Sequence, residues 1–247
     1  MVQKVFLLNV GANCSHGSLR SPVFADGRFE FLPIPETGVG NCDTKVIPKY
    51  CDLFTKELVP KSYLNRLVHN DPEFESFTYG DYPTRIPRVS VLRHSQKGDF
   101  LFFIARLVEY AVSGNCTGKA GFYLIGFFEL SDILEEVNHP LGEYEFAIFG
   151  KNAHVRRALL DPRWYDGFWL FKGGGRSQRF IKAIPFDNRF WTIMRDRYGQ
   201  PWVWKDGRSE LQTIGSYTRT CRLIEGGVAV KFLTEVNEAL HGGCNVI

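Results

Sequence analysis

The stretch that decides the fold reads DFLFFIARL over residues 99–107 and, after a polar connection, GFYLIGFFEL over residues 121–130. Both runs are short, rich in aromatic and branched apolar residues, and bounded by polar or glycine-containing segments, as buried strands are. A third apolar run, over residues 89–92, lies just before them. Together the three runs predict an antiparallel meander that forms the core of a sheet.

The segments outside this sheet core add a further strand and helices. Residues 3–10 form another β-type run. Residues 152–160 predict a short basic helix, and residues 228–240 repeat apolar side chains at helical spacing. No repeat and no linker interrupts the chain. The sequence therefore predicts a single domain over residues 1–247, with an α+β fold built on a mixed, mainly antiparallel sheet and flanking helices.

Composition excludes several classes of protein. Of the 247 residues, 44% are hydrophobic and 23% are charged, which is near the globular average and argues against disorder. The longest apolar runs fall well short of the roughly 20 residues that cross a bilayer, so no membrane partner is expected. Six cysteines without a CxxC pair favour a reducing, cytoplasmic location. The net charge of +3 permits contact with a polyanion without requiring it.

A polar loop over residues 69–88 gathers the group types that general acid–base chemistry needs. Its prolines favour a rigid loop over a helix, and Arg85 adds a guanidinium. An acidic surface loop anchored by a buried tyrosine explains the same composition equally well. Because no third ligand accompanies the first His and Asp, no metal is assigned. The candidate catalytic residues are His69, Asp71, Tyr79 and Asp81.

A glycine-rich basic loop over residues 172–182 is the second candidate. Three consecutive glycines free the backbone to offer N–H groups to an anion, so the loop is suited to cradle a phosphate. It lacks the ending of a Walker motif, and a hairpin loop with solvated basic side chains is the alternative. The side chains that would bind phosphate or nucleic acid are Arg85 of the polar loop and Lys172, Arg176, Ser177 and Arg179 of this loop.

The sheet core itself carries a short motif. A turn at Gly98 and Asp99 opens the first long strand, and Gly126 lies in the middle of the second. This arrangement resembles the barrel core of the PUA-like superfamily, which implies a pocket that receives a base lifted out of its stack. An ordinary antiparallel pair of strands explains the same short pattern.

Several motifs in order along the chain resemble one family. They read NVGAN over residues 9–13, SPVF over 21–24, FEF over 29–31 and PIPE over 33–36, followed by the polar loop, the Gly98 turn and the glycine-rich loop. Together they resemble the family of nucleotide-modification-associated domains of type three. That family is linked to hypermodification of DNA bases in phage and prokaryotic systems.

The resemblance implies that the protein acts on or recognises modified nucleobases in DNA, with the two loops lining one cleft. In that cleft Asp71 or Asp81 would read the base edge or act as a general base, and His69 would carry a proton. Tyr79 or Phe77 would stack against the base, and the glycine-rich loop would hold a phosphate. The residues expected to complete the pocket are Asn13, Asp26 and Phe77.

Three functions stay open on the sequence. The protein is an enzyme that modifies a base or removes a modified one, a non-catalytic reader of modified bases, or an enzyme acting on free nucleotides. DNA or a nucleotide is the expected partner in each case. The sequence identifies no cofactor and no oligomeric state, and it leaves open whether Cys14 is a nucleophile or an inert thiol.

Overall fold

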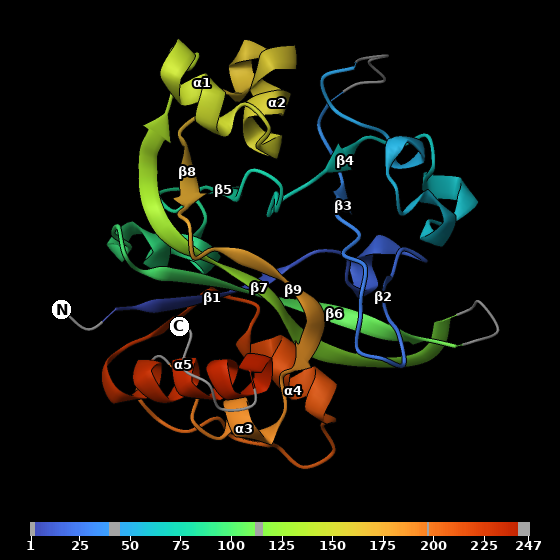
Figure 1. Cartoon of the computed structure of the whole chain (residues 1–247), viewed down its shortest axis with the longest axis vertical. Helices are drawn as coiled ribbons and strands as arrows, with labels where there is room; N and C mark the ends of the chain where they lie inside the picture. The colour runs from blue at the N-terminus through green and yellow to red at the C-terminus, as the bar shows by residue number, and fades with distance from the viewer. Residues whose placement is uncertain (1–2, 40–44, 112–115, 197, 242–247) are drawn as a thin grey trace.

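The computed structural model describes residues 3–39, 45–111, 116–196 and 198–241. Within these residues a curled sheet of eight strands runs through the centre of the molecule, in the order β10-β1-β6-β7-β8-β5, with β2 paired to β6 and β9 paired to β7 (Figure 1). Two further short strands form a separate pair. The strands are β1 (Val5–Val10), β2 (Ser21–Val23), β3 (Ile34–Pro35), β4 (Val68–His69), β5 (Thr78–Asp81), β6 (Phe100–Tyr110), β7 (Cys116–Val137), β8 (Phe168–Gly173), β9 (Gln178–Pro185) and β10 (Arg222–Ile224).

The sheet is mixed and mainly antiparallel. β6 pairs antiparallel with β7, and β7 pairs antiparallel with both β8 and β9. Two pairs are parallel, because β1 and β2 both run alongside β6 in its own direction. The predicted α+β class is confirmed, and the parallel pairing of β1 with β6 is a feature that the apolar pattern alone did not indicate.

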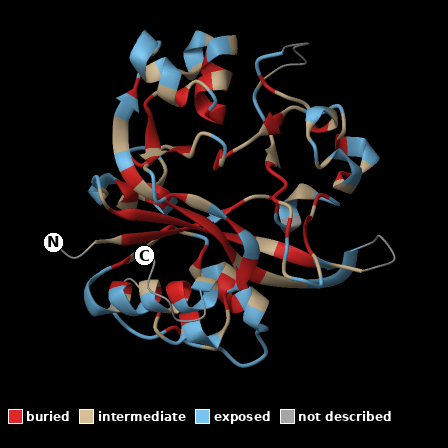
Figure 2. Ribbon diagram, in the orientation of Figure 1, coloured by how far each residue is buried: buried red, intermediate tan, exposed pale blue. Residues whose placement is uncertain are grey.

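The central strand β6 is buried along almost its whole length (Figure 2). On one face Phe103 meets Phe128 with ring centroids 4.7 Å apart, and on the other face Phe102 meets Phe127 at 5.0 Å. Full burial of each such ring stabilises the fold by about 1.5 to 3 kcal/mol. Because both faces of β6 are covered, residues 99–107 read as a continuous apolar run rather than an alternating one.

Strand β7 is shared between two parts of the sheet. Its first part pairs with β6 and β9, and its last part, from Leu130 to Val137, pairs with β8. Gly126 lies where β9 approaches, and a Cβ there would be 2.6 Å from the carbonyl oxygen of Gln178 and 2.7 Å from the ring of Phe74. A glycine is therefore needed at this crossing. Beyond it β7 curls and carries β8 and β5 toward the end of the molecule that holds α1 and α2 (Figure 1).

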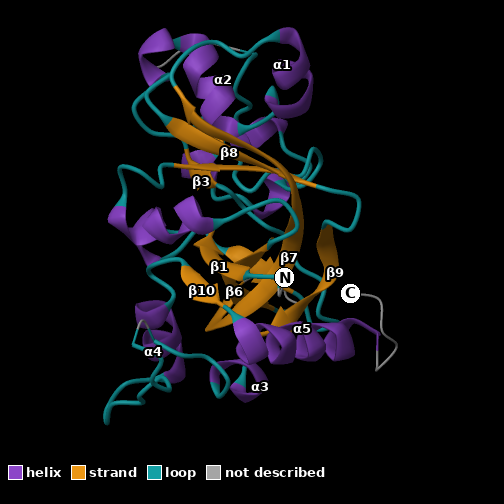
Figure 3. Ribbon diagram, turned by 90° about the vertical axis from the view of Figure 1, so that its left-hand side faces the viewer, coloured by secondary structure: helices purple, strands orange, loops and turns teal. Residues whose placement is uncertain are grey.

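Helices cover the sheet at two opposite ends (Figure 3). Phe232 of the C-terminal helix packs on Phe102 with centroids 5.1 Å apart, so the amphipathic helix expected at 228–240 is confirmed. The basic helix expected at 152–160 is also confirmed. Among the described residues, no helix is both long and apolar enough to cross a membrane. The α-helices are α1 (Glu143–Phe149) and α2 (Ala153–Leu160) at one end, and α3 (Asn188–Trp191), α4 (Glu210–Tyr217) and α5 (Gly226–His241) at the other.

One predicted strand is wrong. Residues 89–92 belong to a 3₁₀ helix, η5, in which Pro87 occupies the first turn. Its fixed backbone angle favours a helical start, and the buried Val89 and Leu92 lie three residues apart, which is one 3₁₀ turn. The apolar run at residues 89–92 is too short to show whether its period is that of a strand or of a helix, so the prediction of a strand was wrong. The 3₁₀ segments are η1 (Cys14–His16), η2 (Tyr50–Asp52), η3 (Lys56–Leu58), η4 (Lys61–Tyr63), η5 (Pro87–His94) and η6 (Pro162–Trp164).

Candidate functional site

The polar loop after β4 folds back so that its two ends meet. Glu73 is buried and accepts hydrogen bonds from the backbone N–H groups of Glu75 at 2.8 Å and Ser76 at 2.7 Å, which fixes the turn. β5 then runs beside the end of β4. As a result Gly80 donates its N–H to both carboxylate oxygens of Asp71, at 3.2 and 3.0 Å.

Helix α2 delivers two more polar side chains to this place. Asn152 caps the helix by accepting from the N–H of His154 at 2.9 Å, and it is itself fully buried. His154 and Arg157 lie three residues apart and so share one face of the helix. A Cβ at position 80 would lie 2.4 Å from Cδ2 of His154, so a glycine in β5 is what lets α2 approach this closely.

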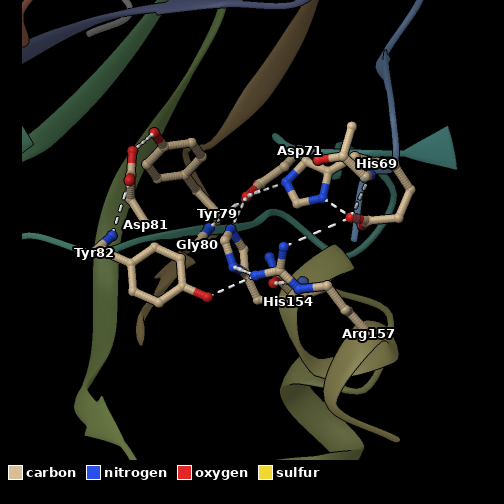
Figure 4. A network of polar contacts seen from close by, with 11 residues as sticks. His69, Asp71, Tyr79, Gly80, Asp81, Tyr82, His154 and Arg157 are labelled. Atoms are coloured by element: carbon tan, nitrogen blue, oxygen red, sulfur yellow. Dashed lines mark hydrogen bonds and ion pairs between the residues drawn. The ribbon is translucent and has the colours of Figure 1, made fainter. Parts of the chain in front are cut away.

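Asp71 lies between two histidines (Figure 4). Its Oδ2 is 3.3 Å from Nε2 of His154 and 4.0 Å from Nε2 of His69, and the two imidazole rings meet edge to face at 4.9 Å. The side chain of Asp71 is 4% exposed. Burial raises the pKa of this carboxyl well above its usual range, against the opposing effects of the His69 charge and the Gly80 hydrogen bond.

Glu36, at the end of β3, holds the first of these histidines. Its Oε2 is 2.8 Å from Nδ1 of His69, and its Oε1 accepts from the N–H of Thr37 and lies 3.6 Å from Nη1 of Arg157. Burial acts to raise the pKa of Glu36, but the hydrogen bond from His69 and the charges of His69 and Arg157 outweigh it, so the pKa is lowered. Glu36 is therefore an acceptor, and His69 donates from Nδ1.

His154 is held in the opposite tautomer. Arg157 approaches its Nδ1 at 3.2 Å and also donates to the hydroxyl of Tyr82 at 2.6 Å. A guanidinium only donates, so Nδ1 accepts and the ring proton sits on Nε2, facing Asp71. Burial, followed by the charges of His69 and Arg157, lowers the pKa of His154 to about 3, which keeps the ring neutral near pH 7.

Tyr79 and Asp81 lie in the adjoining part of β5. The hydroxyl of Tyr79 donates to Asp81 at 2.6 Å, and Asp81 also accepts from the N–H of Tyr82 at 2.8 Å. The ring of Tyr79 packs between Phe103 and Phe171 and is 6% exposed. The faces of the Tyr79 ring thus contact core side chains, and its hydroxyl points to Asp81.

These groups line a cleft of about 420 Å³. The loop after β1 and the segment 218–221 after α4 form other parts of its wall. Asn9 ties the two together by donating to the hydroxyl of Thr218 at 2.9 Å. The residues expected from the sequence that do line this cleft are Asn13, His69, Asp71, Tyr79 and Asp81.

Two arginines at the cleft, Arg88 and Arg219, are exposed. Neither guanidinium forms a hydrogen bond or an ion pair with another residue of the described chain. The backbone links their segments, since the N–H of Cys221 donates to the carbonyl of Arg88 at 2.8 Å. The cleft thus offers two cations whose donors are free for a ligand.

The glycine-rich loop lies elsewhere. Residues 172–177 are absent from the described lining of the cleft, so the expectation that both loops share one cleft is wrong. Lys172 donates through Nζ to the carbonyl of Ser76 at 2.6 Å, and Arg176 pairs with Glu129. The hydroxyl of Ser177 accepts from the N–H of Glu129 at 3.1 Å.

The backbone of this loop is engaged as well. The N–H of Gly173 donates to the carbonyl of Phe77, and the N–H of Gly174 to the carbonyl of Glu129, both at 2.7 Å. Amides that already donate to carbonyls are not available to cradle a phosphate. The loop serves here to join β8, β7 and β5.

The other expected residues are spread over the surface and the core. Asp26 and Arg179 line a second cavity of about 1060 Å³, where Arg179 pairs with Glu30 at 3.0 Å. Arg85 forms an exposed pair with Asp166 at 2.6 Å. Phe77 packs against Phe128 with centroids 5.7 Å apart.

The structure does not support the expectation from the sequence that the polar loop binds no metal. That expectation rested on the lack of a third partner for His69 and Asp71, and α2 supplies that partner as His154. One ligand atom from each of the three residues lies within 4.8 Å of the others. The cluster is therefore able to hold a metal ion as well as to move a proton.

Sequence reasoning missed three members of this site. His154 and Arg157 were assigned to a basic helix face, although a histidine followed three residues later by an arginine was a usable signal for a shared face. Glu36 is the last residue of the PIPE motif, but nothing in the sequence marks it as a partner of His69, because the two lie 33 residues apart and meet only through the pairing of β3 with β4.

A family model described as nucleotide modification associated domain 3 matches residues 4–187 of the chain. The match covers the strands and the helix that carry Asp71, both histidines and Glu36. No curated protein and no solved structure matches the chain.

Proposed function

The chain belongs to the nucleotide modification associated domain 3 family, and from that premise we propose that it is an enzyme acting on one nucleobase of DNA in the cleft around Asp71. The family links the chain to the modification of nucleic-acid bases. The choice of DNA, the phage or prokaryotic setting and the PUA-like barrel stay predictions from sequence resemblance.

The observation that supports an enzyme over a reader is the buried cluster of Asp71, His69 and His154. Burying a carboxylate among imidazoles costs stability unless it is fully paired, and such groups gather where they take part in chemistry. A reader needs only neutral donors and acceptors that match the edge of a base. The cluster goes beyond that need, because it offers both a proton donor and a proton acceptor at one wall of the cleft.

The dimensions of the cleft support a single base as the substrate. About 420 Å³ lies within the usual range for small-molecule sites, and Asp71 is buried in its wall. A base in DNA would therefore have to leave its stack to reach Asp71. Arg88 and Arg219 are placed to hold the flanking phosphates, in place of the glycine-rich loop.

The test is incubation of the protein with matched DNA and RNA oligonucleotides that carry ordinary or hypermodified bases. Mass spectrometry of the strands and of the released small molecules follows. A mass change that disappears in Asp71→Asn is the expected result. Asp132→Asn is the matched control, since Asp132 pairs with Lys97 at 2.8 Å, outside the cleft.

Other outcomes would overturn the proposal. Selective retention of the modified strands without any mass change would make the protein a reader. Turnover of free nucleotides, with binding that depends little on salt, would make it a nucleotide enzyme, because contacts along a polymer release counterions and give a steep salt dependence.

A further inference from the structure

The most specific chemistry in the molecule is the placement of three nitrogen and oxygen atoms around one point beside Asp71. We infer that Nε2 of His69, a carboxylate oxygen of Asp71 and Nε2 of His154 form a binding site for one divalent transition-metal ion. Two imidazoles and one carboxylate form the ligand set of non-haem Fe(II) sites and of catalytic zinc sites, both of which keep open positions.

The two distances from Asp71 are close to those expected around a shared ion, and the ligand atoms of the two histidines lie within 4.8 Å of each other. Bonds of about 2.0 to 2.2 Å to one metal put neighbouring ligand atoms about 3.0 to 3.4 Å apart. Oδ2 of Asp71 is 3.3 Å from Nε2 of His154 and 4.0 Å from Nε2 of His69. The first distance already matches, and the second requires a shift of about half an ångström, which a side-chain rotation provides.

The tautomer of His69 leaves its Nε2 atom available to bind a metal ion. Its Nδ1–H donates to Glu36, whose other oxygen faces the N–H of Thr37 and the guanidinium of Arg157. Nε2 of a neutral His69 therefore presents a lone pair toward the carboxylate of Asp71. A metal ion between these two atoms would bind the lone pair of Nε2 and an oxygen of Asp71 together.

Glu36 completes the arrangement typical of metal sites. Histidines that bind a metal through one nitrogen usually donate from the other to a carboxylate, which fixes the ring and its tautomer. Glu36 does this for His69 at 2.8 Å with a side chain that is 2% exposed. Glu36 is thus a positioning residue rather than a ligand.

His154 must change its protonation to bind the ion. The proton on Nε2 has to move to Nδ1 by exchange with solvent, because histidine binds a metal as a neutral ring through a nitrogen that carries no proton. Arg157 loses nothing essential if its contact with Nδ1 breaks, since it keeps Tyr82 at 2.6 Å and Glu36 at 3.6 Å. The three ligands also line the cleft, so the remaining coordination positions of the ion face the space proposed for the base.

The test measures the metal in the absence of nucleic acid. The full chain is stripped with a chelator and titrated with Zn²⁺, with Fe²⁺ under anaerobic conditions and with Mg²⁺ as the oxygen-preferring comparison. Calorimetry gives the affinity and elemental analysis the stoichiometry. One equivalent of Zn²⁺ or Fe²⁺, bound far more tightly than Mg²⁺, is expected.

Variants separate a site from adventitious binding. Asp71→Asn and His154→Gln should lower the affinity at least 100-fold, and Glu36→Gln about 10- to 100-fold by releasing His69. His94→Gln is the control, because His94 is exposed and lies outside the cluster. Far-ultraviolet circular dichroism confirms that each variant is folded, and Asp71→Glu, which keeps the carboxylate, should retain more affinity than Asp71→Asn.

The metal site is overturned if the wild type binds no more metal than Asp71→Asn. It is also overturned if the folded ligand variants keep full affinity. Its failure is distinct from that of the proposed function. A protein that binds one ion but leaves every oligonucleotide unchanged keeps the site and refutes the base-modifying enzyme.

Discussion

The polar loop at 69–88 and the glycine-rich loop at 172–182 look alike as lists of residues, and the structure separates them completely. Both are rich in groups that bind ligands. In the polar loop, Asp71 and His69 meet partners from β3 and α2 at the wall of a cleft. In the glycine-rich loop, Lys172 and Arg176 are already paired with the protein itself. What distinguishes the candidate site from the structural loop is therefore that Asp71 and His69 border a cleft, whereas Lys172 and Arg176 do not line it.

The largest effect expected from this contrast is on turnover. Asp71→Asn removes the carboxyl group of the buried cluster and should lower the rate of base modification by about 10²- to 10⁴-fold, the usual contribution of a positioned acid–base group. Arg176→Ala should leave that rate close to wild type. Mass spectrometry of the oligonucleotide over time gives both rates. An equal loss in Arg176→Ala would show that the two loops act together after all.

The next effect is on stability, and it compares two glycines. Gly80→Ala places a Cβ against His154 and should lower the free energy of unfolding by about 1 to 3 kcal/mol. A Cβ at Gly175 meets no described atom within 4 Å. Gly175→Ala should therefore be neutral or stabilising by up to about 1 kcal/mol. Urea unfolding followed by tryptophan fluorescence measures both, and a tolerant Gly80 would mean that α2 does not need its close approach.

A smaller effect concerns phosphate contacts. Arg88→Ala and Arg219→Ala should each weaken binding of single-stranded DNA and reduce the slope of log affinity against log salt by about 1. Lys172→Ala should not change that slope, because its Nζ is bound to Ser76. Fluorescence anisotropy across a salt series is the measurement. The reverse pattern would return the phosphate site to the glycine-rich loop.

The smallest effect on stability concerns the ion pair between Arg176 of the glycine-rich loop and Glu129 of β7. Nε of Arg176 donates to Glu129 at 2.8 Å, and the arginine side chain is 48% exposed. Exposed pairs contribute up to about 1 kcal/mol and are screened by salt. Arg176→Ala should therefore lower the unfolding free energy by less than that amount, and by less still in 1 M salt. A larger loss would indicate that the loop holds the strands together more firmly than its contacts imply.

Much of the fold could be predicted from local pattern, because β6 and β7 are long and apolar enough to be recognised without their neighbours. The strand predicted at residues 89–92 is wrong because four residues are too few to show a period. Pro87 in the first turn favours the 3₁₀ helix that forms there instead. The parallel pairing of β1 with β6 joins segments about a hundred residues apart, and no local signal encodes it.

The site divides in the same way. His69 and Asp71 could be identified as candidate site residues because they lie two positions apart in the chain and carry side chains suited to acid–base chemistry. Glu36 and His154 could not be placed, because they reach the cluster only through the pairing of β3 with β4 and the packing of α2 on β5. The role of Lys172 was misjudged for the opposite reason. A lysine with an internal partner and one without look identical in a sequence.

The wall of the cleft around Thr218 and Arg219 lies outside the span of the family match, which ends at residue 187. The buried cluster lies wholly within that span. The cluster that we propose as the chemical centre thus lies in the part that the family model describes, and this part of the rim lies outside it. Relatives that share only the matched part would keep the first and be free to replace the second. Substitutions within residues 218–221 would then alter the rim of the cleft and leave the buried cluster unchanged.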